Sequence, residues 1–419
     1  MRILILSYFF PPYNTIGAVR VGKLAKYWHE RGHEVRVISA ENQLEPQTLA
    51  LGIPQQQVTY CKWANLNFWV RLLSREKGDA LSSATTDERQ GLLSKLATLY
   101  RATVNFPDGK IGWYPYALDA SNKLLEGWKP DVIYASAHPL TTLLVAERLA
   151  SRHRIPWFAE LRDLWTQNHY YTYGFPRRDL ETRLERRTLS QASGLITVSE
   201  PLADSLRTFG LPTETILNGF DLEDYPKQTT PPNPKLQIIY TGIIYAGKRD
   251  PTPLFQALRQ MGEQANEIEA HFYGRKLAMV EALAKAQGVA GSVHVHEAVP
   301  YQESLRLQKS ADALLLLTWD HPSENGVYTG KLFEYIGASR PILTLGSQDS
   351  VAARLILSRG LGLTTTNPAQ IAQWLTQLLE QKRSGGIPDL PASAQKGLSR
   401  VEQFERLDGF IAQQLGAKG

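Results

Sequence analysis

The segment Tyr328-Thr329-Gly330-Lys331-Leu332-Phe333-Glu334-Tyr335-Ile336-Gly337-Ala338-Ser339-Arg340-Pro341-Ile342-Leu343 predicts a loop, a short helix and then an apolar strand. The helix should begin at Thr329 and Gly330, where backbone N–H groups have no partner inside the helix and can hold an anion. Lys331 adds a positive charge there. Glu334 follows one turn later on the same side and could accept from two neighbouring hydroxyls. This pattern suits a diphosphate beside a ribose; the alternative is an ordinary capped helix with solvated charges.

A strand, a loop, a helix and a second strand open the chain. Residues 2–10 form a continuous apolar run, as expected of a parallel strand that is covered on both faces. Helical periodicity runs from 18 to 28, and a second strand follows at 33–40. The unit predicts a parallel sheet with ligands at its carboxyl edge. There, Gly17 can let a phosphate or sugar approach the backbone.

Two later strands lead to candidate catalytic residues. The strand 131–136 is followed by His138, and the strand 155–159 is followed by Arg162 and Asp163. All three therefore lie at the edge of the sheet where sites gather, although a single histidine is more often structural than catalytic. Arg162 and Asp163 could pair with each other, or Asp163 could serve as a base or as a carboxylate that holds an acceptor. The residues alone leave these readings open.

The polar, Pro-rich segment 227–234 is the best linker in the chain. A second series of strands and helices starts at 235, and its first loop carries Lys248 and Arg249, which could also be solvated loop charges. A length of 419 residues favours two hydrophobic cores. The sequence therefore predicts an α/β protein with two doubly wound domains, residues 1–226 and 235–398.

Composition excludes several classes of protein. Apolar residues at 43% and charged residues at 21% are typical of a soluble globular protein. The single cysteine, Cys61, rules out disulfides within the chain and cysteine-based zinc sites, and it fits a reducing cytosol. The net charge of +5 is compatible with phosphate-rich substrates or an anionic membrane, and no motif indicates nucleic acid. We expect a cytoplasmic protein, because no apolar run approaches a membrane span.

The segments quoted above resemble family-four glycosyltransferases of the GT-B fold. The resemblance rests on Lys-Leu-Phe-Glu-Tyr at 331–335, on the first unit through Arg31-Gly32-His33-Glu34-Val35, and on the turn Asn218-Gly219. It implies two facing Rossmann-like domains, with the acceptor side on the first and the nucleotide sugar mainly on the second. It also implies that the final helix, within 399–419, packs back on the first domain. The helical spacing predicts an apolar face on this helix, made of Val401, Phe404, Leu407, Phe410 and Ile411.

The resemblance also assigns roles to single residues. It implies that Glu334 holds the ribose, that Lys248 binds the diphosphate, and that a histidine near His138 contacts the donor sugar or the reacting centre. The predicted catalytic residues are His138, Asp163 and Lys248; the predicted donor-binding residues are Gly17, Lys248, Arg249, Glu324, Thr329, Gly330, Lys331 and Glu334.

Two positions depart from the family pattern. The family's first glutamate falls at Gly326 here, and Glu324 stands two residues earlier. The family carries an arginine at the start of the second domain, where this chain has Ile243. Arg249 could take the place of that arginine. These departures mildly favour an alternative, an inactive GT-B module that binds a nucleotide or a partner. A sugar-nucleotide epimerase or phosphorylase of the same architecture is the other alternative.

The preferred hypothesis is a retaining glycosyltransferase that moves a sugar from a nucleotide diphosphate sugar to a hydroxyl acceptor. We expect no cofactor and no metal, because lysine, arginine and helix N–H groups would stabilise the departing diphosphate. The stereochemistry is implied by the resemblance.

An aromatic segment, residues 63–116, bears on the acceptor. Trp63, Leu66 and Trp69 share a predicted helical face with basic residues beside it, which suits a membrane interface. The alternative is that this face packs into the protein's own core. The segment predicts a lipid-linked or polysaccharide-precursor acceptor and a peripheral contact with the inner face of the cytoplasmic membrane.

Overall fold

The computed structural model describes the whole chain except residues 68–99, 101–102, 227–232, 246, 276 and 417–419. The chain divides into two compact units, the first made of residues 1–216 and 406–419 and the second of residues 217–405. Each unit contains one sheet whose paired strands all run parallel. The prediction of two Rossmann-like α/β domains is therefore confirmed.

The first sheet has the strand order β3-β2-β1-β4-β5-β6-β7. Its strands are β1 (Arg2–Leu6), β2 (Glu34–Ala40), β3 (Val58–Cys61), β4 (Val132–Ala137), β5 (Trp157–Leu161), β6 (Gly194–Thr197) and β7 (Thr213–Thr215). The helices of this unit are α1 (Ile16–Glu30), α4 (Tyr114–Gly127), α5 (Thr141–His153), α6 (Arg177–Leu189) and α7 (Glu200–Arg207).

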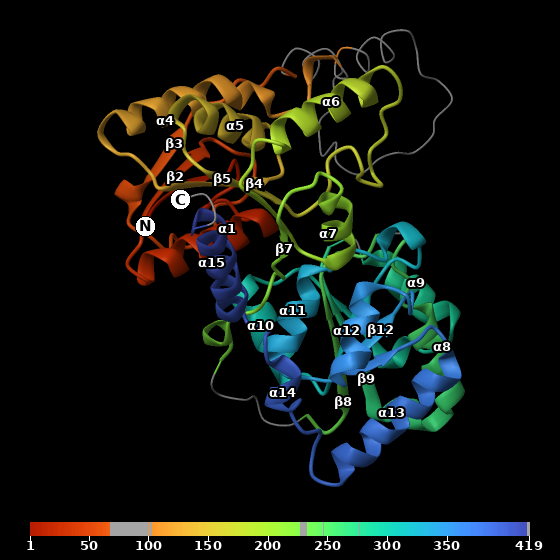
Figure 1. Cartoon of the computed structure of the whole chain (residues 1–419). Helices are drawn as coiled ribbons and strands as arrows, with labels where there is room; N and C mark the ends of the chain where they lie inside the picture. The colour runs from red at the N-terminus through yellow and green to blue at the C-terminus, as the bar shows by residue number, and fades with distance from the viewer. Residues whose placement is uncertain (68–99, 101–102, 227–232, 246, 276, 417–419) are drawn as a thin grey trace. The chain divides into compact units, whose positions relative to one another are not determined.

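Helices cover both faces of the first sheet, which explains why its strands are apolar throughout. Figure 1 shows α4 and α5 on one face and α1 on the other. Alternate residues of β1 point to opposite faces, so that Leu4 and Leu6 pack under α4 and α5. On the other face, the ring of Trp28 in α1 lies 5.3 Å from that of Tyr134 in β4.

The last helix, α15 (Arg400–Gly416), contributes its second half to the first unit. Asp408 accepts hydrogen bonds from the indole Nε1 of Trp28 at 2.6 Å and from the hydroxyl of Tyr27 at 3.2 Å. The ring of Phe410 lies 5.8 Å from that of Phe158 in β5. These contacts place α15 beside α1, on the face of the sheet opposite α4 and α5 (Figure 1).

The second sheet has the order β10-β9-β8-β11-β12-β13. Its strands are β8 (Leu236–Thr241), β9 (Ile268–Tyr273), β10 (Val293–His296), β11 (Ala313–Leu317), β12 (Ile342–Leu345) and β13 (Gly362–Thr364). The helices are α8 (Thr252–Met261), α9 (Ala278–Ala286), α10 (Tyr301–Ser310), α11 (Gly330–Ala338), α12 (Val351–Arg359), α13 (Pro368–Arg383) and α14 (Ala392–Gln395).

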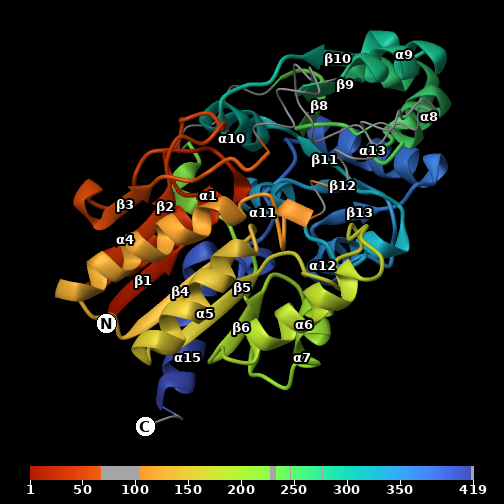
Figure 2. The same ribbon diagram turned by 90° about the horizontal axis from the view of Figure 1, so that it is seen from above.

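Two apolar clusters, one on each face, hold the second sheet. One packs β8, β9 and β11 against α8, α9 and α13, and the other packs β11 and β12 against α10, α11 and α12. Figure 2 shows the same sheet from above, with β10 at its outer edge. Residues 217–226, which the sequence analysis assigned to the first domain, group with this unit because Phe220 and Tyr225 pack into the second cluster.

Two details differ from the sequence-based expectation. Residues 62–67 are not helical, and Trp69 lies outside the described residues. The indole of Trp63 instead donates to the carbonyl oxygen of Glu41 at 3.0 Å and packs at the edge of the first core. In α15, Val401 is 50% exposed, although its helical spacing predicted a buried position.

None of the helices in the described part of the chain is both long and apolar enough to span a membrane.

Candidate active site

Most of the predicted donor-binding residues gather at the carboxyl ends of β8 and β11. These two strands are neighbours in the sheet, yet the chain leaves β8 towards β9 and leaves β11 towards β12. Connections that diverge in this way open a crevice at the strand ends, where ligands of α/β proteins bind. The loop after β8 supplies Gly242, Lys248 and Arg249, and the start of α11 supplies Lys331 and Glu334.

Lys331 extends its side chain from the first turn of α11 across the end of β8. A Cβ atom at Gly242 would lie 2.3 Å from the Lys331 ammonium nitrogen, so only glycine leaves room for the lysine there. The ammonium also lies 5.5 Å from the centre of the Tyr240 ring. Burial lowers the pKa of Lys331 to about 8; the charge on Arg249 acts in the same direction and that on Glu334 opposes it. A desolvated ammonium beside a second cation favours the arrival of an anion.

Lys248 and Arg249 lie in the loop that follows β8. The ammonium of Lys248 is 4.4 Å from the centre of the Trp319 ring, and its side chain is exposed. The Arg249 guanidinium lies 5.0 Å from the centre of the Tyr245 ring and donates to the carbonyl oxygen of Ile243 at 3.0 Å. Arg249 therefore occupies the neighbourhood of the position where the family pattern has its arginine.

Glu334 is held in place by Gln308, a fully buried residue of α10. The Gln308 amide nitrogen donates to the Glu334 carboxylate at 3.1 Å and to the hydroxyl of Thr241 at 3.0 Å. Burial raises the pKa of Glu334, while the hydrogen bond from Gln308 and the charge on Lys331 oppose that rise. The carboxylate is thus oriented and partly desolvated, one turn after Lys331.

The start of α11 offers hydrogen-bonding groups of its own. Thr329 occupies the N-cap position without a capping hydrogen bond, and its buried hydroxyl oxygen finds no partner among the described residues. A Cβ at Gly330 would meet no atom within 4 Å, so the backbone there is approachable. Glu324 lies in the 3-10 turn Pro322–Glu324 before the helix and is partly buried. Its donor-binding role stays a prediction.

In the first unit, a buried charged cluster lies between the sheet and α1. The Glu160 carboxylate, at the end of β5, accepts from Arg20 Nε of α1 at 2.8 Å and from the hydroxyls of Tyr134 at 2.7 Å and Ser136 at 2.5 Å. Arg162 Nε lies 3.9 Å from the same carboxylate. Burial opposes ionisation of Glu160, but the two arginines outweigh it and hold its pKa below the ordinary value.

Gly17, His138 and Asp163 lie around this cluster at the carboxyl edge. A Cβ at Gly17 would come within 2.7 Å of the Arg162 guanidinium, so packing against Arg162 is one reason for a glycine here. His138 Nδ1 lies 3.8 Å from an Asp163 carboxylate oxygen, and Asp163 is 64% exposed. Burial lowers the pKa of His138; the charge on Asp163 opposes this effect and the charge on Arg162 adds to it.

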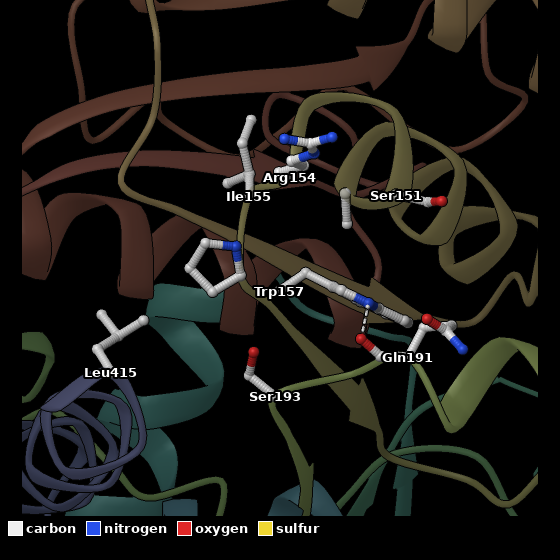
Figure 3. Close-up of a pocket in the computed structure, with 9 residues that line it drawn as sticks. Ser151, Arg154, Ile155, Trp157, Gln191, Ser193 and Leu415 are labelled. Carbon is white, nitrogen blue, oxygen red and sulfur yellow. Dashed lines mark hydrogen bonds between the residues drawn. The ribbon is translucent and has the colours of Figure 1, made fainter. Parts of the chain in front are cut away.

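A hollow of about 440 Å³ on the first unit lies at the opposite edge of its sheet (Figure 3). Ile155 and Trp157 line it at the start of β5, and Ser193 lines it just before β6. The indole nitrogen of Trp157 already donates to the carbonyl oxygen of Gln191 at 2.9 Å. The hollow therefore lies at the amino ends of the strands, whereas ligands of this fold bind at the carboxyl ends.

Sequence reasoning missed Arg20 and Gln308. Arg20 is spaced four residues before Leu24, within the apolar stripe of α1, and is 2% exposed. A charged residue on an apolar stripe is a detectable sign of a buried ion pair. Gln308 has no comparable local sign, because its partners Thr241 and Glu334 belong to other elements.

Comparison with known proteins supports the GT-B architecture. Residues 17–219 match the family model described as a glycosyl transferase 4-like domain. No curated protein sequence matches the chain significantly.

Solved structures of similar fold cover almost the whole chain. A lipopolysaccharide outer core galactosyltransferase, WaaB, is 13% identical with a TM-score of 0.58, over 99% of this chain and 100% of the other. The Anabaena protein HepE, in complex with UDP-glucose, is 15% identical with a TM-score of 0.58, over 99% and 100%. A putative UDP-N-acetylglucosamine 2-epimerase from Listeria monocytogenes is 13% identical with a TM-score of 0.58, over 99% and 97%. The chain therefore shares its fold with proteins that handle nucleotide sugars.

Proposed function

We propose that this chain, which has the GT-B fold and matches a glycosyl transferase 4-like domain over residues 17–219, moves a sugar from a nucleotide diphosphate sugar to a hydroxyl acceptor with retention of configuration. The observation that carries the proposal is the pairing of Lys331 and Glu334 on α11. Lys331 is a desolvated cation at a helix start, and Glu334 is an oriented carboxylate one turn away. A diphosphate fits the first and a ribose fits the second.

The proposed chemistry begins with cleavage of the bond between the sugar C1 and the diphosphate oxygen. The charge that develops on the diphosphate is stabilised by Lys331, Lys248, Arg249 and the N–H groups at the start of α11. The acceptor oxygen bonds to C1 on the same face, and its proton passes to the departing phosphate. We propose that His138 and Asp163 contact the reacting sugar or the acceptor.

A panel of nucleotide sugars tests this function directly. With the matching donor, the protein should release nucleoside diphosphate slowly without an acceptor and rapidly with one. Without an acceptor only water can attack C1, whereas a bound acceptor presents its hydroxyl to C1. Release of a free epimerised sugar or nucleotide sugar would instead favour the epimerase alternative, which the Listeria neighbour supports by fold. Absence of turnover with any donor, together with nucleotide binding, would favour the inactive module.

Metal independence is the next expectation. Two lysines, one arginine and a helix start can balance the charge of the diphosphate, so donor turnover should persist in excess EDTA. The measurement is the rate of nucleoside diphosphate release before and after chelation. A loss of activity that magnesium or manganese restores would contradict the proposed role of these cations.

We propose that the acceptor is lipid-linked or a polysaccharide precursor, met at the cytoplasmic face of the membrane. The net charge of +5 and the fold shared with a lipopolysaccharide galactosyltransferase support this. Trp63 contributes less than expected because it packs at the edge of the core. The loop before α6 exposes aromatic rings instead: Phe175 is 86% exposed and Tyr170 is 56% exposed. Exposed aromatic residues suit a lipid headgroup region.

Vesicle sedimentation tests the membrane contact. The protein should sediment with vesicles that contain anionic phospholipid at low salt and be released by high salt, because the attraction is about 1 kcal/mol per basic residue and is screened. Phe175→Ser should weaken sedimentation without changing thermal stability, since the ring makes little contact with the core. A protein that stays in the supernatant at low salt would contradict the proposal and favour a small soluble acceptor.

A further inference from the structure

A cluster of side chains that can bind a metal lies on strands β9 and β10 of the second unit. Glu269 and His271 stand two residues apart on β9, and His294 of β10 is the register partner of His271. Residues two apart in a strand point to the same face of a sheet. Ala270 and Phe272, which point the other way, belong to the buried core of the unit. The three ligand groups therefore share one face, which helices α8 and α9 do not cover.

The ligand atoms of the three side chains already lie close together. One imidazole nitrogen from each histidine and one carboxylate oxygen all lie within 4.8 Å of one another. His271 Nε2 is 3.4 Å from one oxygen of Glu269, and His294 Nε2 is 3.9 Å from the other. Both Nε2 atoms are shielded from solvent and face the Glu269 carboxylate, but neither makes a hydrogen bond of good geometry with the residues that the structure describes. Such nitrogens lack a partner that a metal ion would provide.

A second layer of contacts orients these ligands. His271 Nδ1 lies 2.9 Å from His296 Nε2, so a proton on Nδ1 can be donated to His296 and the lone pair on Nε2 remains available. The Gln237 amide nitrogen donates to a Glu269 oxygen at 2.9 Å. Ligand orientation by a second hydrogen bond is a regular feature of metal sites in proteins.

We infer that Glu269, His271 and His294 form a binding site for a divalent transition metal of the zinc class. Two imidazole nitrogens and one carboxylate suit zinc and its neighbours, whereas magnesium and calcium prefer sites made of oxygen atoms. Zinc–nitrogen bonds of about 2.0–2.1 Å place tetrahedral ligands about 3.4 Å apart.

The surroundings of the cluster indicate how a metal would bind and what it would stabilise. Lys235 Nζ lies 3.1 Å from the Glu269 carboxylate; its side chain is 45% exposed, so it can turn to solvent when a metal takes its place. Three protein ligands leave the fourth position of a tetrahedral metal to water. Because β10 is the edge strand of the sheet, the metal links this edge to β9 and stabilises the second unit. The site is separate from the donor residues on α11 and in the loop after β8.

Cobalt titration of the whole protein tests the site. Co²⁺ should bind with a stoichiometry of one and give the intense visible absorption of a tetrahedral ion, and Zn²⁺ should displace it. Glu269→Gln and His294→Ala should each lower the Zn²⁺ affinity by more than about a hundredfold, because each removes a ligand. His296→Ala should lower it by about 10- to 100-fold, since it removes only an orienting contact.

Controls separate metal binding from folding and from donor binding. His169→Ala, a change at an exposed histidine of the first unit, should leave Zn²⁺ affinity unchanged. All variants should keep the far-ultraviolet circular dichroism and the nucleotide affinity of the wild type. Zn²⁺ should raise the melting temperature of the wild type but not of His294→Ala. Equal Zn²⁺ affinity in the wild type, Glu269→Gln and His294→Ala would overturn the inference.

Discussion

Glu160→Gln is expected to destabilise the first unit by about 3–5 kcal/mol, the loss that follows when one partner of a buried ion pair is removed. Glu160 is fully buried, and the Arg20 side chain with which it pairs is 2% exposed. Glutamine has nearly the same shape but cannot neutralise Arg20 and Arg162. The variant would leave the buried guanidinium of Arg20 and the partly buried guanidinium of Arg162 without the Glu160 charge.

Urea unfolding, followed by circular dichroism, measures this effect. The double variant Arg20→Met/Glu160→Met should recover part of the loss, because it removes one of the two arginines that Glu160 neutralises and leaves only Arg162 without that carboxylate. A matched control is Glu200→Gln, which removes a carboxylate whose partner Arg207 is 45% exposed, and it should change stability little. A shift of less than about 1 kcal/mol for Glu160→Gln would contradict an ionised Glu160 as the neutralising group.

Lys331→Met and Glu334→Ala are each expected to weaken nucleotide diphosphate binding by about 1.5–3 kcal/mol, or about 10- to 150-fold. Each removes one charge-assisted contact to the donor. Lys331→Met also removes a desolvated ammonium, so the folded state should be as stable as the wild type or more stable. Calorimetry with the matching nucleotide and a thermal melt measure the two effects. Lys285→Met and Glu281→Ala, on the exposed side of α9, serve as matched controls.

The pH dependence identifies the role of Lys331 separately. Its pKa is lowered to about 8, so the free protein carries the charge below pH 8 and loses it as the pH rises through that value. A diphosphate prefers the charged form, so nucleotide affinity should fall between pH 7 and pH 9. Lys331→Met should abolish most of this dependence. Unchanged nucleotide affinity in both Lys331→Met and Glu334→Ala would contradict the assignment of the donor site to α11.

Local sequence patterns were sufficient for the architecture. The apolar run at 2–10 predicted a buried parallel strand, and the structure has β1 there. The start of α11 was placed at Thr329 and Gly330, and the structure has its N-cap at Thr329. These features depend on residues close in sequence, because strand burial, helix periodicity and capping are set by neighbours along the chain.

The aromatic segment shows where that reasoning failed. The helical spacing of Trp63 and Leu66 predicted a helix over residues that are not helical, because Trp63 binds the backbone at Glu41 and packs beside Tyr8 instead. The rest of that predicted helix, from residue 68 on, lies outside the described residues. A periodic pattern over so few residues does not outweigh tertiary contacts.

The sequence by itself determined the parallel strands, the two domains and the residues of the motif on α11. The tertiary structure alone decided which charged and polar groups meet. Arg20 and Glu160 are 140 residues apart, Gln308 and Glu334 are 26 apart, and His271 and His296 are 25 apart. Such contacts depend on strand order and on the face to which each side chain points, and neither is encoded within a local window. Electrostatics and hydrogen bonding act through space, so the partners of a buried charge become known only when the sheets are assembled.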